Sequence, residues 1–471
     1  MLRRFSSSTA LCALLASSGA ARALPVGEAA AARQMTLVEA LAYARVHQPQ
    51  VRSALAEVRA RLAEAQVPRA QWFPQVGATA QVFYGTANNT TALYLAVPEA
   101  DLPRIGATKA GATGAWTPSP STIVAASLDQ EVYDFGRIAA QAAVADALAE
   151  ETRAGAEVVA LDVQLGVEEA YHGVLAGKEV LRATDEALRR AVTHRDYAQA
   201  GVRTGLRPPI ELTRAEADVA QLEVRKVRAE SSLQIARAAF AAAIGSDALE
   251  IDAAPLAPGE SPTPAFAEAL RAAVEKNPIV AQAIARLAAQ RYATTAIGRE
   301  LLPNLLATAG LSARAGGAVP SSGAASDVPT GGGWLPDVPN WFAGLVLQWN
   351  VFDATVLARR QASQAREEAA QADFDLARMN ATLLAQRAWL DLDAATRALP
   401  GLESALKAAQ ANQAQADARF KAGIGNVVEL ADAEALLINA ELELAIGRFN
   451  VARARAQLGR AMGEHENGRT R

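Results

Sequence analysis

The sequence predicts a mainly α-helical chain with a small β part, made of two copies of one structural unit. Residues 39–51, "EALAYARVHQPQV", return as "EALRAAVEKNPIV" at 268–280, which indicates an internal repeat. Long alanine-rich stretches carry leucines at seven-residue intervals, which is typical of coiled-coil helices. Four short segments alternate apolar and polar residues, which is typical of strands with two different faces.

Within each copy the predicted elements follow the same order. A first helix, at 36–68 and again at 265–299, ends at a proline-marked entry into extended chain. Two strands follow, separated by a loop rich in Gly, Pro, Ser and Thr, and then a very long helix at 135–204 and at 354–422. A glycine turn and a further helix close the unit. Pro400 should kink or interrupt the second long helix.

The glycine turn is the same in both copies. The segment "VRTGLRPPIELTRAEADV" at 202–219 returns as "FKAGIGNVVELADAEALL" at 420–437. The alignment pairs Gly205 with Gly423, and an acidic helix start follows each glycine. We therefore expect two helical hairpins, one per copy, that turn at these glycines.

The chain begins with the features of a secretory signal peptide. Arg3 and Arg4 precede an apolar run at 11–16, and an A-x-A cleavage site ends at Ala23. Beyond it, no apolar run is long enough for a transmembrane helix. The expected boundaries are the signal peptide at 1–23, the first repeat at 24–246, a proline-rich linker or small surface subdomain at 247–264, the second repeat at 265–462 and a tail at 463–471.

The second long helix carries two staggered leucine series, which predict two apolar seams and therefore two packing neighbours. At about 1.5 Å per residue, a helix of nearly 70 residues spans about 105 Å, far beyond a globular core. A dimeric structural coiled coil is the simpler alternative, but it leaves the strands unexplained. The two series are Leu376, Leu383 and Leu390, and Leu392, Leu399 and Leu406.

The last strand has two tryptophans on one apolar face. Trp341 and Trp349 are eight residues apart, which is about 26 Å along a strand and close to the apolar height of an outer-membrane barrel. Tyr84 ends the apolar face of the first strand. These three residues are candidates for membrane-interface aromatics. The edge of a soluble β-sandwich alternates in the same way and is the alternative interpretation.

Four strands cannot close a barrel alone, because single-chain membrane barrels begin at about eight strands. An open edge in lipid would also leave backbone N–H and C=O groups without partners. We therefore expect an oligomer around a shared barrel, and geometry alone allows two, three or four copies.

No pattern in the sequence indicates catalytic or cofactor chemistry. The formal charge of −4 gives no reason to expect nucleic acid. The only cysteine, Cys12, lies in the predicted signal, so the processed chain has no thiol. The glycines at 331–333 lack the following helix and lysine of a phosphate loop. We therefore expect no enzyme, with no catalytic residue and no cofactor-binding residue.

The histidines do not form a metal-ligand pattern. They are scattered along the chain at His47, His172, His194 and His465. Glu168 and His172 have an i, i+4 spacing that suits a metal ion, but a solvated helix face has the same spacing. We therefore expect no metal site.

The order of elements is specific: helix, two strands, long helix, glycine turn and acidic helix, twice, with Asn277-Pro278 and Leu302-Pro303 in the second copy. This order resembles the TolC-like outer membrane channels of drug efflux and type I secretion systems, over nearly all of the chain after the predicted signal. The resemblance implies a homotrimer in the outer membrane of a Gram-negative bacterium. Each chain would give four strands to a transmembrane β-barrel surrounded by outer membrane lipid, and two hairpins to a helical tunnel that crosses the periplasm.

The resemblance also implies a function, that of a passive exit duct. An inner-membrane transporter, either an ABC or a proton-driven one, would deliver proteins or small molecules through a periplasmic adaptor. The alternative is a periplasmic adaptor or structural coiled-coil protein that never enters the membrane. The apolar face with Trp341 and Trp349 argues against that alternative.

In the family, one hairpin carries Tyr-x-x-Gly-x-Arg-x-x-x-Asp-x-x-Asp, whose aspartates ring the closed tunnel entrance. These positions fall, in order, on Phe420, Gly423, Gly425, Glu429 and Asp432. The other hairpin's acid, a partner of the tyrosine, falls on Glu211. The resemblance thus implies an acidic constriction, whereas Phe420 and Gly425 lack the hydroxyl and the charge of the family's latch.

Glu429 and Asp432 also have a simpler interpretation. Acids in the first turn of a helix stabilise its positive end by roughly 0.3 to 1 kcal/mol each. On that interpretation the two carboxylates belong to an ordinary helix start.

Overall fold

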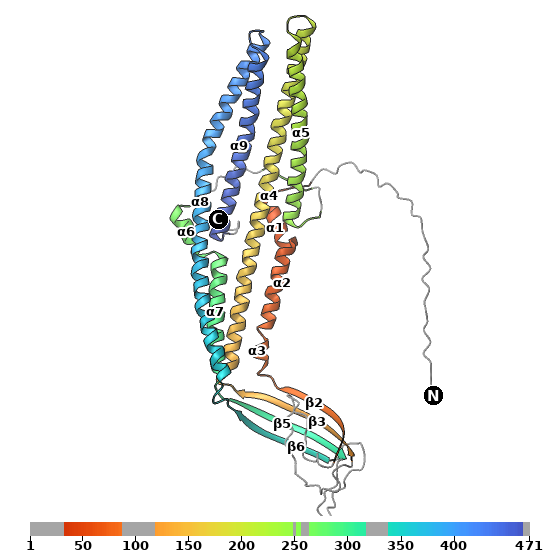
Figure 1. Cartoon of the computed structure of the whole chain (residues 1–471), viewed down its shortest axis with the longest axis vertical. Helices are drawn as coiled ribbons and strands as arrows, with labels where there is room; N and C mark the ends of the chain where they lie inside the picture. Colours follow the sequence, from red (N-terminus) through yellow and green to blue (C-terminus); the bar gives the residue numbers. More distant parts are fainter. Residues whose placement is uncertain (1–32, 87–117, 248–250, 256–262, 317–337, 465–471) are drawn as a thin grey trace, which may run out of the picture.

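The molecule is elongated, with a four-stranded sheet at one end and two long helical hairpins whose tips lie at the other (Figure 1). The predicted signal peptide, the glycines at 331–333 and His465 lie outside the described residues. The computed structural model describes residues 33–86, 118–247, 251–255, 263–316 and 338–464.

The helices and strands repeat one order, which confirms the predicted mainly helical, two-repeat architecture. The first copy contains α1 (Leu37–His47), α2 (Pro49–Glu64), α3 (Val67–Ala70), β2 (Gln75–Thr86), β3 (Pro118–Tyr133), α4 (Arg137–Arg203) and α5 (Pro209–Ile244). The second contains α6 (Phe266–Glu275), α7 (Pro278–Arg299), β5 (Asn304–Gly316), β6 (Val338–Gln348), α8 (Ala354–Lys421) and α9 (Val427–Met462). In the part of the chain that the structure describes, no helix combines the length and apolar character needed to cross a membrane.

The first helix of each copy is broken at a proline, where the sequence predicted continuous helices at 36–68 and 265–299. A new helix, α2, begins at Pro49, and α7 begins at Pro278. Proline has no N–H to donate and disfavours helical geometry in the residue before it. It therefore fits the first position of a new helix better than the interior of a continuous one.

Pro400 does not interrupt the second long helix, so that part of the prediction is wrong. The helix α8 runs through Pro400 without a break. Pro400 is exposed, so water can donate the hydrogen bond that the proline removes from the preceding turn. Close by, the side chain of Leu402 packs over Gly447 of α9, where an added Cβ would collide with it. Packing against α9 thus supports α8 around the proline.

The sheet is antiparallel with strand order β2-β3-β5-β6, so β2 and β6 are its edges. Its register confirms the predicted shared face, because Val76 lies opposite Leu128, and Leu311 lies opposite Trp341. The exposed fractions of Val76, Leu311 and Trp341 are 75%, 66% and 78%. One face of the sheet is therefore apolar and uncovered by the rest of the described chain.

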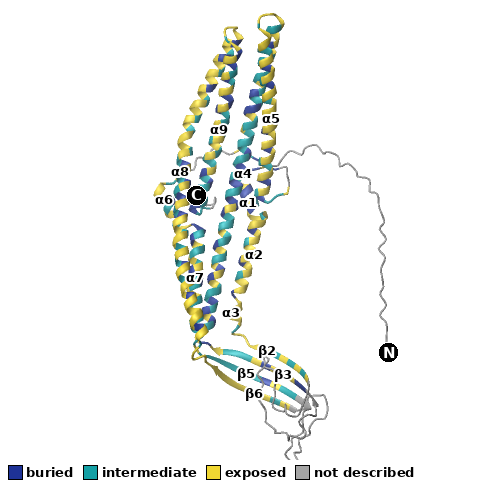
Figure 2. Cartoon of the chain, in the orientation of Figure 1, coloured by how far each residue is buried: buried dark blue, intermediate teal, exposed yellow. Residues whose placement is uncertain are grey.

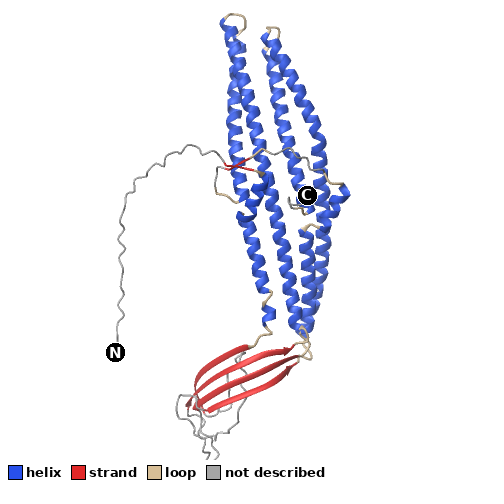
Figure 3. Ribbon diagram, turned by 180° about the vertical axis from the view of Figure 1, so that it is seen from behind, coloured by secondary structure: helices blue, strands red, loops and turns tan. Residues whose placement is uncertain are grey.

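A short parallel pair, β1 (Arg33–Met35) with β4 (Ile251–Ala253), lies beside the middle of the helices (Figure 3). The sequence predicted a linker or small surface subdomain around β4 and no strand at either place, since three-residue strands leave no periodic signal. Asp252 is buried between two cations, with Nζ of Lys178 at 2.8 Å and Nη2 of Arg237 at 3.2 Å. The pair thus ties the linker to α4 and α5.

Candidate functional site at the hairpin tips

The two tips share one backbone turn. The α4/α5 hairpin turns at Gly205 and the α8/α9 hairpin at Gly423, where φ is 71° and 76°. This left-handed conformation is open to glycine and costs other residues roughly 1–2 kcal/mol. Gly205 and Gly423 therefore lie where the glycine turns were expected.

The tips differ in where each places its arginine. In the internal repeat, Gly201 aligns with Arg419, and Arg207 aligns with Gly425. A Cβ added to Gly201 would lie 2.7 Å from Cδ of Arg207, and one added to Gly425 would lie 3.2 Å from Cβ of Arg419. Each tip thus holds one arginine against one glycine, with the two positions exchanged.

Arg207 reaches from the first tip to the second. Its Nη1 donates to Oε2 of Glu211 at 2.8 Å, and its Nη2 donates to the carbonyl oxygen of Phe420 at 2.8 Å. Its guanidinium also lies over the Phe420 ring, with Cζ 3.8 Å from the centroid, which is a cation–π contact. Phe420 is 2% exposed. We call this the Arg207–Phe420 contact, and it joins the two hairpins.

Sequence reasoning missed Arg207, although a signal was present. Arg207 occupies, in the first repeat, the position that Gly425 occupies in the second, where the family motif has its arginine. Phe420 has no hydroxyl, but its ring and its carbonyl both bind the guanidinium. The structure thus supplies from the other hairpin a polar contact that the sequence predicted to be missing.

Glu429 and Asp432 lie exposed at the start of α9. The N–H of Glu429 donates to Oδ1 of Asn426 at 2.8 Å, which caps the helix. Oε1 of Glu429 lies 3.0 Å from Nε of Arg419, and these side chains are 42% and 54% exposed. Glu211, in contrast, is 17% exposed and bound to Arg207. The acidic ring of Glu429 and Asp432 stays a prediction, because it needs neighbouring copies.

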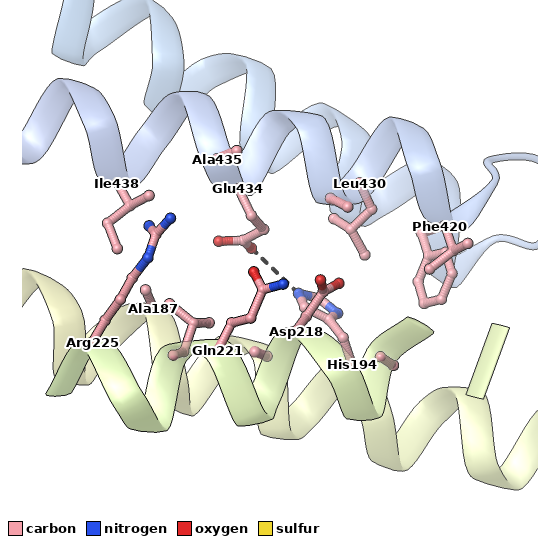
Figure 4. A pocket seen from close by; sticks show the side chains of 15 residues that line it. Ala187, His194, Asp218, Gln221, Arg225, Phe420, Leu430, Glu434, Ala435 and Ile438 are labelled. Atoms are coloured by element: carbon pink, nitrogen blue, oxygen red, sulfur yellow. Dashed lines mark hydrogen bonds and ion pairs between the residues drawn. The ribbon is translucent and has the colours of Figure 1, made fainter. Parts of the chain in front are cut away.

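Near the tips, the two hairpins enclose a cavity of about 140 Å³. Figure 4 shows His194 and Asp218, from α4 and α5, facing Glu434 of α9 across it. Burial raises the pKa of the Glu434 carboxyl, but hydrogen bonds from His194 and Arg190 outweigh burial, so this pKa lies below its ordinary value. Burial raises the pKa of the Asp218 carboxyl. The sequence did not predict this cavity, because its residues come from four different helices.

Glu168 and His172 of α4 pack against other helices. Glu168 is 4% exposed, so the interpretation as a solvated helix face is wrong for it. It accepts a hydrogen bond from Nε2 of Gln164 at 2.8 Å. Burial, together with the nearby charge of Arg455, lowers the pKa of His172 to about 4. Within the described ranges, no group of three or more His, Cys, Asp and Glu side chains is arranged to hold a metal ion.

The fold and the tips define a class of proteins with two duplicated helical hairpins and a small sheet at one end. A family model described as Outer membrane efflux protein matches residues 40–246 and 269–464. Because these matches cover most of the chain, the chain belongs to the outer membrane efflux protein family. Membership confirms the resemblance to TolC-like channels and the outer membrane location, and the members of this class are channels rather than enzymes. No curated protein sequence matches the chain.

Solved structures share this fold at low sequence identity. The outer-membrane channel OprN matches with a TM-score of 0.72 at 20% identity, over 91% of this chain and 90% of that chain. The Campylobacter jejuni CmeC outer membrane channel matches with 0.72 at 14% identity, over 91% and 85%. The open state of the Neisseria gonorrhoeae MtrE outer membrane channel matches with 0.68 at 17% identity, over 91% and 89%. These comparisons establish the fold.

Proposed function

We propose that three copies of the chain form a passive exit duct, with a shared barrel in the outer membrane and a helical tunnel in the periplasm. The sheet carries this proposal, because one of its faces is apolar and exposed, and its edge strands β2 and β6 have no partner on their outer sides within the described chain. In lipid, strands of neighbouring copies would satisfy these edges. The number three follows from the resemblance to the family.

Exposed aromatic residues lie where the sheet meets the helices, as expected at a membrane interface. In this group Trp349 donates from Nε1 to the carbonyl oxygen of Leu301 at 3.1 Å. Trp341 lies farther along β6, and Tyr84 lies in β2, with its side chain outside the described part. We assign Trp341 and Tyr84 to the outer interface. The group at the other interface comprises Trp72, Phe73, Tyr133, Phe135, Trp349 and Phe352.

The outer helices leave apolar seams for a neighbouring copy. Buried and half-buried residues run along α4, whereas α8 is largely exposed (Figure 2). Leu392, of one leucine series, is 1% exposed within the chain. In the other series, Leu376, Leu383 and Leu390 are 50%, 59% and 56% exposed. On the opposite side of the bundle, α5 exposes Val224, Val227 and Ile235.

These two seams fit the wall of a closed tunnel. The helices of one copy follow the order α5, α4, α9, α8, so α5 and α8 are the outermost. In a ring of copies, the half of α8 nearer the tip would pack against α5 of the next chain, and the half nearer the sheet, with Leu376 and Leu383, would pack against α2. Burial of apolar side chains would stabilise both contacts.

At the periplasmic end, each copy would contribute the carboxylates of Glu429 and Asp432 to a ring around one axis. Their exposure near the start of α9, Glu429 in the first turn and Asp432 in the second, supports this placement. Like charges this close repel one another and attract multivalent cations. Glu211 would act differently, because it binds Arg207 and supports the Arg207–Phe420 contact that holds the hairpins together.

A duct of this kind has no energy source of its own. An inner-membrane transporter, ABC or proton-driven, would supply the energy and choose the substrate, and a periplasmic adaptor would connect it to the tips. The family description favours small-molecule efflux over type I protein secretion. An exposed apolar sheet argues against a periplasmic adaptor or a structural coiled coil, because neither enters the membrane.

Assembly and insertion test this function. Detergent-extracted protein should migrate as a heat-sensitive trimer. Leu345→Arg, on the exposed face of β6, should cost about 2 to 4 kcal/mol at mid-bilayer and reduce the folded trimer in membranes. Gln348→Arg, on the other face at the end of β6, is the matched control and should be mild. A monodisperse monomer with an intact sheet, or normal Leu345→Arg trimers, would contradict the proposal.

A further inference from the structure

His194 of α4 lies between the two hairpins and faces both helices of the other one. Its Nε2 is 3.3 Å from Oε1 of Glu434 in α9, and its Nδ1 is 3.9 Å from Oδ1 of Asp417 in α8. The side chain is 13% exposed. Its ring meets the edge of Phe420 at 6.0 Å between centroids. One imidazole thus links three of the four helices that form the tips.

The groups around His194 favour an imidazole ring that carries a proton on each of its two nitrogens. When the imidazole is neutral and its proton lies on Nε2, toward Glu434, Nδ1 directs a lone pair toward Asp417. Nδ1 of His194 and Oδ1 of Asp417 are both buried, and neither has a hydrogen-bond partner among the described residues. A second proton on Nδ1 would replace this repulsion by an ion pair.

In the described part of the chain, no neighbouring cation binds the Asp417 oxygen that lies nearest to Nδ1 of His194. Arg190 donates from Nε to Oε2 of Glu434 at 2.8 Å, and Lys421 donates from Nζ to Oδ2 of Asp417 at 2.7 Å. Each cation therefore binds the carboxylate oxygen that is not the one nearest to His194. The charged and titratable groups around the imidazole are Arg190 of α4, Asp218 and Arg225 of α5, Asp417 and Lys421 of α8, Glu434 of α9, and Arg207 across Phe420.

We propose that His194 is a proton-binding site that makes the contact between the hairpins sensitive to pH. The imidazolium ties α4 to α8 and α9 in acid, and its deprotonation loosens the tips. Both carboxylates lie beside the imidazole only in the packed arrangement, so a second ring proton favours packing, and acid therefore strengthens the contact between the hairpins while base weakens it. The contacts of His194 with Glu434 and Asp417 lie within one chain, so only their effect on conduction rests on the proposed function.

The test measures the separation of the tips in the full chain in detergent, with doubly labelled chains diluted by unlabelled ones. Spin labels on cysteines at Leu206 and Ile424, which are 82% and 73% exposed, report this separation by double electron–electron resonance. Between about pH 5.5 and about pH 8, the separated population should rise about tenfold, which corresponds to ~1.4 kcal/mol. His194→Gln should show the separated population at both values.

His172→Gln is the matched control. The pKa of His172, about 4, keeps its ring neutral over this range, so the variant should keep the wild-type response. Asp417→Asn keeps the side-chain shape but removes the anion, so it should weaken the response even if His194→Gln fails to assemble.

Two results would overturn the proposal: a wild-type separation that does not change with pH, or a His194→Gln or Asp417→Asn chain with the full wild-type response. Because the distance does not depend on conduction, the outcome is independent of the duct. A pH-sensitive separation in a chain that forms no conducting trimer would contradict the proposed function and leave the role of His194 intact.

Discussion

The α4/α5 tip and the α8/α9 tip have the same glycine turn and an equivalent acid, Glu211 in one and Glu429 in the other. They differ in their arginine, which follows the turn at Arg207 but precedes it at Arg419. At the first tip, the side chains of Arg207 and Glu211 are each 17% exposed, and the guanidinium of Arg207 lies over the Phe420 ring. At the second tip, the arginine and glutamate of the pair are 54% and 42% exposed.

This difference teaches how a duplicated unit acquires two roles. The repeat preserves the backbone turn, because glycine at positive φ is needed in both copies. Exchange of one arginine with one glycine then commits Glu211 to holding the hairpins together. It leaves Glu429 and Asp432 facing solvent, where they can line an entrance.

The largest effect is expected from Arg207→Gln. It leaves Glu211 without its cation and weakens the bond to the Phe420 carbonyl, and hydrogen bonds to charged groups contribute roughly 1.5–3 kcal/mol. A loss of about 2 kcal/mol would raise the open fraction about thirtyfold in single-channel recordings. Arg419→Gln is the control and should change little, because its pair is exposed. Equal effects of the two variants would contradict the proposed difference between the tips.

The turns themselves should respond alike. Neither Gly205 nor Gly423 has an atom within 4 Å of an added Cβ, so alanine is disfavoured there only by its backbone conformation. Gly205→Ala and Gly423→Ala should each cost roughly 1–2 kcal/mol. Thermal dissociation of the proposed trimer measures both losses. Clearly unequal losses would show that the two turns are not equivalent.

A smaller effect is expected from Gly425→Arg, which restores the arginine of the family motif. The sequence alone predicts that this change restores a latch. In the structure, a Cβ at this position would lie 3.0 Å from the backbone nitrogen of Phe420, whose ring is already occupied by Arg207. We therefore expect a modest loss of stability, about 1 kcal/mol, and no increase in the closed times of the channel. Longer closed times in single-channel recordings would refute this.

The parts of the fold that depend on local pattern were predictable. Glycine turns at Gly205 and Gly423, and the apolar face that contains Trp341, follow from short-range geometry. The break at Pro49 carried a signal too, but helical periodicity on both sides of it favoured one long helix.

The inter-hairpin contacts were not predictable from pattern. The hydrogen bond from Arg207 to Phe420 joins residues 213 positions apart, and that from His194 to Glu434 joins residues 240 apart. Such pairs depend on how the two hairpins pack, and no spacing rule reports this. The strands β1 and β4 were missed for a different reason, because three residues are too few to show alternation.

The central claim is that the α8/α9 tips form the acidic entrance of a channel, and planar-bilayer recording of the double variant Glu429→Ala, Asp432→Ala tests it most directly. The variant should lose cation selectivity and block by multivalent cations added on the periplasmic side. The stability of the proposed trimer should fall only slightly, since only Glu429 lies in the first turn of α9, where an acid contributes roughly 0.3–1 kcal/mol. Glu443→Ala, an exposed acid farther along α9, should keep both properties. A double variant with wild-type selectivity and block would contradict the account and leave Glu429 and Asp432 as ordinary helix-start acids.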